Sequence, residues 1–265
     1  MTAPDQYTLL YDGSFDGLLS AVFTVYAGKY PPDCVHITAD PNDADLFGHT
    51  VSVANSPEHA ARVLERLQRQ LGRCGIQTLI YGFLVNDKDM PDTFLRIVRL
   101  ALAHPDRPNI LSDYGHPDVM QWAQWVKTVS REKHHMEAFV RFEEYHVQGE
   151  PDPVYIARIE PQFDILPLIT RFFRNRYSGM QWLIFDVGRR YGVYFDKTAV
   201  HQIRDLDTSG EHAAPSDRER HYQKLWQRYF KSATVTSRIN LRQHRQMMPQ
   251  RYWRYLTEKR PMLRE

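Results

Sequence analysis

EAFVRFEEY (residues 137–145) is the stretch that decides the fold, because its apolar and polar residues alternate. The turn-forming segment QGEPDP (148–153) follows it, and VYIARIEP (154–161) comes next. A period of two is typical of a strand with one buried face, and a turn between two such runs predicts a β-hairpin. We therefore expect a sheet to begin near Glu137.

The segments after this hairpin extend the sheet. DILPLITRFFRNRYSG (164–179) has the spacing of an amphipathic helix and ends in Ser-Gly. Three short strands are then predicted, separated by turn signals: QWLIFDV (181–187), RYGVYFD (190–196) and AVHQIRDL (199–206). The order ββαβββ predicts an antiparallel sheet with a helix on one face, and hence an α+β fold rather than a doubly wound α/β fold.

The half of the chain before this region is predicted to be mainly helical. YTLLY (7–11), CVHITAD (34–40) and HTVSVAN (49–55) are short predicted strands, and LLSAVFTVYAGKY (18–30) has helical spacing. SPEHAARVLERLQRQLG (56–72) offers a Ser N-cap, Pro at the first helical position and Gly at its end. Further helices are expected at 76–85, 91–104 and 116–136.

These patterns divide the chain into a strand-turn-helix start with a mainly helical region (1–136), a sheet region (137–207), and a linker with a basic helical tail (208–265). All three could equally form one compact domain. No run of about 18 apolar residues is present, so we expect no membrane association. Cys34 and Cys74 stand alone, which indicates a reducing cytoplasm and no thiol-rich metal site.

Charge is distributed unevenly along the chain. Residues 216–265 contain 13 Lys and Arg against 4 Asp and Glu, a net charge of +9, whereas the rest of the chain carries −7. Such asymmetry indicates either a polyanionic partner or a basic tail that docks on its own acidic body.

The tail interleaves aromatic residues with arginines. Arginine neutralises phosphates and aromatic faces stack on unpaired bases, so a nucleic-acid surface is one interpretation. The alternative is a packed helix face, because Tyr222, Trp226 and Tyr229 recur at helical spacing. The residues predicted to bind nucleic acid are Arg238, Arg242, Arg245, Arg251 and Trp253, together with Arg189 and Arg190 in a predicted hairpin turn.

No motif assigns a reaction, a metal or a cofactor, and the catalytic residues are unknown from sequence. DGSFDG (12–17) could receive an anion or a hydrated metal through Asp12 and Asp16, or simply cap a helix. The other weak candidates for catalysis are His134, His135, Arg141 and Asp186, each with an equally ordinary structural role.

The sequence resembles a bacterial family associated with DNA repair and DNA metabolism and built around a domain of unknown function. The resemblance covers nearly the whole chain. The motifs that carry it are YDGSFDGLLSAVF (11–23), REKHHMEAFVRFEE (131–144), YIARIEPQFDILP (155–167), WLIFDVGRRYGVYFD (182–196) and LWQRYFKSATVTSRINLRQHRQMMPQRYWRYLTE (225–258).

The resemblance implies a setting rather than a mechanism. Members are encoded beside a radical SAM protein linked to DNA repair or modification, and a related domain is fused to uracil-DNA glycosylase-like domains. This chain lacks a CxxxCxxC cluster motif, so radical chemistry would belong to the partner. We therefore expect a DNA-binding accessory protein, acting on single-stranded or damaged DNA. The alternatives are an enzyme acting on a nucleotide or DNA phosphodiester, and a protein-binding scaffold.

Overall fold

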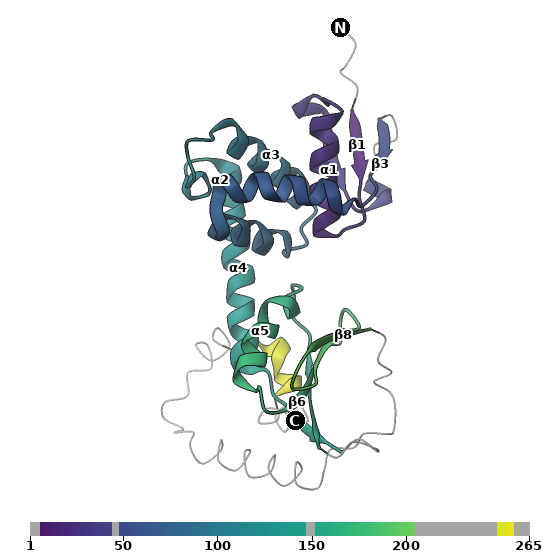
Figure 1. Cartoon of the computed structure of the whole chain (residues 1–265), viewed down its shortest axis with the longest axis vertical. Coiled ribbons are helices and arrows are strands. Elements are labelled where there is room, and N and C mark those ends of the chain that lie inside the picture. Colours follow the sequence, from purple (N-terminus) through teal and green to yellow (C-terminus); the bar gives the residue numbers. More distant parts are fainter. Residues whose placement is uncertain (1–5, 44–47, 147–151, 205–247, 257–265) are drawn as a thin grey trace. The chain divides into compact units, whose positions relative to one another are not determined.

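The chain forms two compact units, Met1–Ser130 and Arg131–Glu265. The computed structural model describes residues 6–43, 48–146, 152–204 and 248–256 (Figure 1). Each unit contains its own sheet, and each is considered by itself below.

The first unit begins with a small parallel sheet. Strand β1 (Tyr7–Leu10) lies between β2 (Val35–Thr38) and β3 (His49–Ser52), and both pairs are parallel. Helix α1 (Phe15–Ala27) connects β1 to β2, as parallel pairing requires a crossover. All three strands and this helix were predicted from the sequence.

The remaining helices of the first unit also follow the sequence. They are α2 (Pro57–Phe83), α3 (Met90–Ala103) and the start of α4 (Pro117–Phe139), with short 3-10 turns η1 (Pro32–Cys34), η2 (Pro41–Asp43) and η3 (Ile110–Ser112). Ser56 caps α2 by accepting a hydrogen bond from the backbone N–H of His59. The helix breaks at Gly72, whose φ of 65° is left-handed, so residues 57–71 and 73–83 form two helical pieces, as expected.

The core of the first unit lies between these helices and the parallel sheet. Leu9, Leu18, Phe94 and Trp122 are almost completely buried there. Trp122 also donates its indole N–H to the carbonyl oxygen of Thr78. This buried N–H therefore has a hydrogen-bond partner.

The second unit has the predicted ββαβββ order. Its elements are β4 (Glu143–Tyr145), β5 (Val154–Ile159), α5 (Leu166–Arg176), β6 (Gln181–Asp186), β7 (Tyr191–Phe195) and β8 (Val200–Arg204). The sheet order is β4-β5-β6-β7-β8. The α+β class is confirmed, but the sheet is mostly rather than wholly antiparallel, because α5 returns the chain so that β5 and β6 run parallel.

The first hairpin strand is shorter than the alternation predicted. Helix α4 continues to Phe139, and the N–H of Val140 still bonds to the carbonyl of Met136. Strand β4 therefore begins at Glu143 rather than Glu137. Met136 and Phe139 are three residues apart, which is also the spacing of a helix. The short alternation that begins at Glu137 therefore fits a helix as well as a strand.

Helix α5 covers only part of the sheet, and this positions the site described below. Its buried residues Leu166, Ile169 and Phe173 lie on one stripe, and Trp182 and Ile184 of β6 are completely buried. Strand β8 at the sheet edge is instead exposed along nearly its whole length. The sheet thus extends beyond the helix that covers it.

Within the tail, only 248–256 lie among the described residues, where Gln250–Tyr255 form the 3-10 turn η5 (yellow in Figure 1). The predicted helical tail otherwise lies outside the described residues. In the described part of the chain, no helix combines the length and apolar character needed to cross a membrane.

Candidate functional site

The register of β7 and β8 brings polar side chains onto one face of the sheet. Tyr191 pairs with Arg204, and Val193 pairs with Gln202. Residues directly opposite each other on antiparallel strands point to the same face. Helix α5 lies on this face and covers part of it. The side chains on the uncovered part form the floor of a recess between the helix and the sheet edge.

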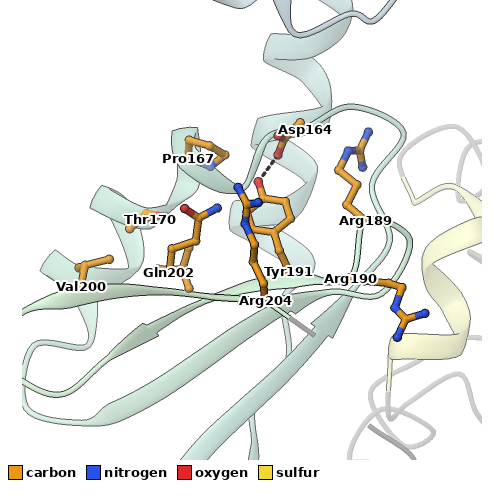
Figure 2. Close-up of a pocket in the computed structure, with 10 residues that line it drawn as sticks. Asp164, Pro167, Thr170, Arg189, Arg190, Tyr191, Val200, Gln202 and Arg204 are labelled. Carbon is orange, nitrogen blue, oxygen red and sulfur yellow. Dashed lines mark hydrogen bonds between the residues drawn. The ribbon is translucent and has the colours of Figure 1, made fainter. Parts of the chain in front are cut away.

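This recess is a groove of about 880 Å³. In Figure 2, Gln202 and Arg204 rise from β8 beside Tyr191, opposite Pro167 and Thr170 of α5. The residues that line it are Asp164, Pro167, Thr170, Arg189, Arg190, Tyr191, Val193, Val200, Gln202 and Arg204. We call this the α5–β8 groove.

Asp164 and Tyr191 meet at one end of the α5–β8 groove (Figure 2). The Tyr191 hydroxyl donates a hydrogen bond to Oδ1 of Asp164. Burial, and then this bond to a carboxylate, raise the pKa of Tyr191 well above its ordinary value. The phenol therefore stays protonated and keeps donating, which leaves Oδ2 of Asp164 as an acceptor without a partner among the described residues.

Arg189 is held by the backbone and by a buried acid. Its Nη1 lies 3.0 Å from Oδ2 of Asp186, and its guanidinium also donates to the carbonyl oxygens of Pro161 and Gln162. Asp186 is completely buried, and burial raises its pKa although Arg189 opposes the shift. These contacts tie the β6–β7 turn to the loop after β5, so they give Arg189 a structural role.

Other arginines around the groove are exposed. Arg190 has a φ of 57° in the β6–β7 turn and points away from the other lining residues in Figure 2. Arg174 lies four residues after Thr170 and seven after Pro167, which places it on the same stripe of α5, with Arg171 beside it. Arg171, Arg174, Arg190 and Arg204 form no ion pair with any residue that the structure describes. Arg174 in α5 and Arg204 in β8 thus place one cation on the helix side and one on the strand side of the groove.

The predicted DGSFDG site serves as a helix cap in the first unit. Oδ1 of Asp12 accepts hydrogen bonds from the N–H and hydroxyl of Ser14, and Oδ2 accepts one from Asn55. The bond from Ser14 lowers the pKa of Asp12, although partial burial opposes the shift. Ser14 in turn caps α1 by accepting from the N–H of Gly17, while Asp16 lies in the first turn of the helix.

His134, His135 and Arg141 have separate surroundings in the second unit. His134 is exposed, and its Nδ1 lies 3.4 Å from Oε2 of Glu137. Burial lowers the pKa of His135, whose ring lies near that of Tyr252. Arg141 donates to the carbonyls of Ala138 and Val140. None of these residues lines the α5–β8 groove, and no group of three metal-ligating side chains occurs in the described ranges.

Two of the predicted tail residues lie in η5, which packs against the rest of the second unit. Arg251 bonds to Glu132, and Trp253 donates its indole N–H to the carbonyl of Met248. Tyr252 and Leu256 are buried. Arg238, Arg242 and Arg245 lie outside the described residues.

Sequence reasoning missed Arg204, Gln202, Arg171 and Arg174. The spacing of Val200, Gln202 and Arg204 at every second residue of a predicted strand was a usable signal, because it places all three on one face. That this face is the one next to α5 depends on strand pairing, which the spacing does not reveal.

A family model described as a domain of unknown function, DUF4130, matches residues 88–258. Neither the curated proteins nor the solved structures contain a match to the chain.

Proposed function

This chain belongs to the DUF4130 family of domains of unknown function, and we propose that it is a DNA-metabolism protein that binds nucleic acid through the α5–β8 groove. The observation that carries the proposal is the set of four exposed arginines, Arg171, Arg174, Arg190 and Arg204, that have no acidic partner among the described residues.

The charge balance around the groove favours an anionic ligand. Asp186 is paired with Arg189, and Asp164 is the one acid among the residues that line the groove, so the exposed arginines outnumber the acids around it. Residues 1–215 as a whole carry a net charge of −7. A local excess of cations on an acidic body attracts anions to that place in particular.

The arrangement of the arginines favours a polyanion over a single phosphate. Arg174 and Arg171 lie on the helix, whereas Arg204 and Arg190 lie on the sheet edge and turn. A small anion is bound by guanidinium groups that converge on one point. Cations spread along two edges instead match a chain of phosphates, as in nucleic acids.

The proposal is one of binding rather than catalysis. Among the six weak catalytic candidates, none lines the groove. An accessory role beside a radical SAM protein, which the family resemblance implies, agrees with a chain that supplies DNA binding while its partner supplies the chemistry. This partnership is part of the proposal.

Salt-dependent binding tests the proposal. Fluorescence anisotropy would measure the affinity of the full chain for labelled DNA, with RNA of the same sequence as comparison, across a range of salt concentrations. We expect the combined change Arg174→Ala and Arg204→Ala to weaken binding. The slope of log K against log salt is negative, and it should become shallower by about one for each phosphate contact that the removed guanidinium groups would make.

Arg176→Ala is the matched control, because Arg176 is on the same helix but stacks on Tyr177, away from the stripe of Thr170. The Arg176→Ala protein should change the salt slope less than the double variant does. Equal slopes for wild type, control and double variant would refute this interface.

A further inference from the structure

We infer that the α5–β8 groove takes an unpaired strand and that Asp164 accepts a hydrogen bond from an amino group of a base within it. The inference rests on the proposed function and names its substrate class.

The floor of the groove suits the base rather than the phosphate. Val193, Val200 and Pro167 supply apolar surface, and the amide of Gln202 is exposed beside them. Thr170 donates its hydroxyl proton to the carbonyl of Leu166 at 2.7 Å, so its oxygen still has acceptor capacity. An unpaired base needs apolar contact for its flat face and hydrogen-bonding groups for its edge.

The acid in the groove keeps phosphates at its edges. Oδ1 of Asp164 is occupied by Tyr191, whose pKa is raised so that it stays a donor. Asp164 lines the groove, so its other oxygen, Oδ2, is available there as an acceptor, and the charge of the carboxylate repels phosphate. Phosphates are attracted instead to Arg174 in α5 and to Arg204 at the end of β8, so a strand that crosses the groove between them turns its bases inward.

A duplex does not satisfy this geometry. In a base pair one N–H of the cytosine amino group is bonded to guanine, and the other faces a major groove flanked by two phosphate backbones. An unpaired strand instead leaves both N–H bonds of the amino group free, and only one phosphate backbone has to be accommodated beside the groove.

Asp164 also predicts which bases are preferred. A carboxylate can accept from the N4 amino group of cytosine, whereas thymine offers the carbonyl O4 at the same position. Thymine would face the carboxylate with a second acceptor, so the groove should discriminate between two pyrimidines of similar size.

The experiment compares three labelled ligands of about 12 nucleotides, a length within the range of known single-strand sites. They are a dT oligomer, a dT oligomer with alternating cytosines, and a duplex of the latter. We expect the cytosine-containing strand to bind about tenfold more tightly than the dT strand, and more tightly than the duplex.

Asp164→Asn is the decisive variant. The asparagine carbonyl can still accept from Tyr191, while its amide N–H₂ replaces the free carboxylate oxygen by a donor. The preference for cytosine should disappear or reverse. Asp152→Asn is the matched control, because Asp152 is an exposed acid that pairs with Lys197 outside the groove. The Asp152→Asn protein should prefer cytosine as strongly as wild type does.

The outcomes separate this inference from the proposed function. If the duplex binds as tightly as the single strand, or if Asp164→Asn keeps the cytosine preference, the inference is wrong, while weaker binding on arginine replacement would still support the proposed interface. If wild type binds none of the ligands at low salt, the proposed function itself is wrong. Thermal unfolding of Asp164→Asn shows whether the variant remains folded.

Discussion

Arg251 donates a hydrogen bond to Glu132, a carboxylate that lies 119 residues earlier in the chain. Glu132 is only 3% exposed, and its other oxygen accepts from the backbone N–H of Gln162. A residue that the sequence suggested as a nucleic-acid contact thus holds η5 against the end of α4. In this segment the basic tail does dock on an acid of its own chain.

The Glu132 contact should stabilise the fold. Arg251→Ala would leave the buried carboxylate of Glu132 without its cationic partner, so we expect the free energy of unfolding to fall by about 2–4 kcal/mol. Urea denaturation measures this. Arg254→Ala is the comparison, because Arg254 pairs with the more exposed Glu160 and should cost less than about 1 kcal/mol. Equal decreases for the two variants would contradict the role assigned to Glu132.

Arg189 should behave differently from its neighbours in the groove. Arg189→Ala removes the partner of the buried Asp186, and we expect the free energy of unfolding to fall by about 3 kcal/mol or more. Its effect on the salt dependence of DNA binding should be small, because its guanidinium is already occupied. A variant with full stability and a reduced salt slope would show instead that Arg189 contacts phosphate.

Gly72 should be intolerant of any side chain. An added Cβ would meet no atom within 4 Å, but φ is 65° and ψ is −175°, a conformation almost restricted to glycine. We expect Gly72→Ala to lower the free energy of unfolding by about 1–3 kcal/mol, whereas Arg73→Ala at the exposed neighbour should change it by about 0.5 kcal/mol or less. Chemical denaturation of both variants would distinguish backbone strain from a general sensitivity of this segment to substitution.

His36 should make the stability of the first unit depend on pH. Burial opposes protonation of His36, but hydrogen bonds to Asp92 at 2.7 Å and Asp43 at 3.1 Å raise its pKa above the ordinary value. Because the folded pKa is the higher one, the stabilisation is complete below the unfolded value of about 6.5. It is lost as pH rises through the folded pKa.

His36→Asn should remove this dependence. Unfolding measured from slightly acidic to slightly alkaline pH should show stability falling for wild type and a flatter profile for the variant. An identical slope in the two proteins would mean that other groups cause the dependence.

Most of the fold was predictable because its signals are local. The Ser56 cap, the break at Gly72 and the amphipathic stripe of α5 each depend on residues within a few positions of one another. The end of α4 was not predictable, since residues 137–139 suit either a strand or a helix. Parallel pairing of β5 and β6 likewise depends on where α5 returns the chain.

The sequence by itself determined the α+β class, the order ββαβββ and the basic hairpin turn that carries Arg189 and Arg190. Only the tertiary structure decided which of these arginines is occupied, and that Arg204 stands opposite Tyr191 beside α5. The physical reason is that helix and turn preferences arise between neighbours in the chain. Burial of a charge and the pairing of strands instead depend on contacts between residues far apart in sequence.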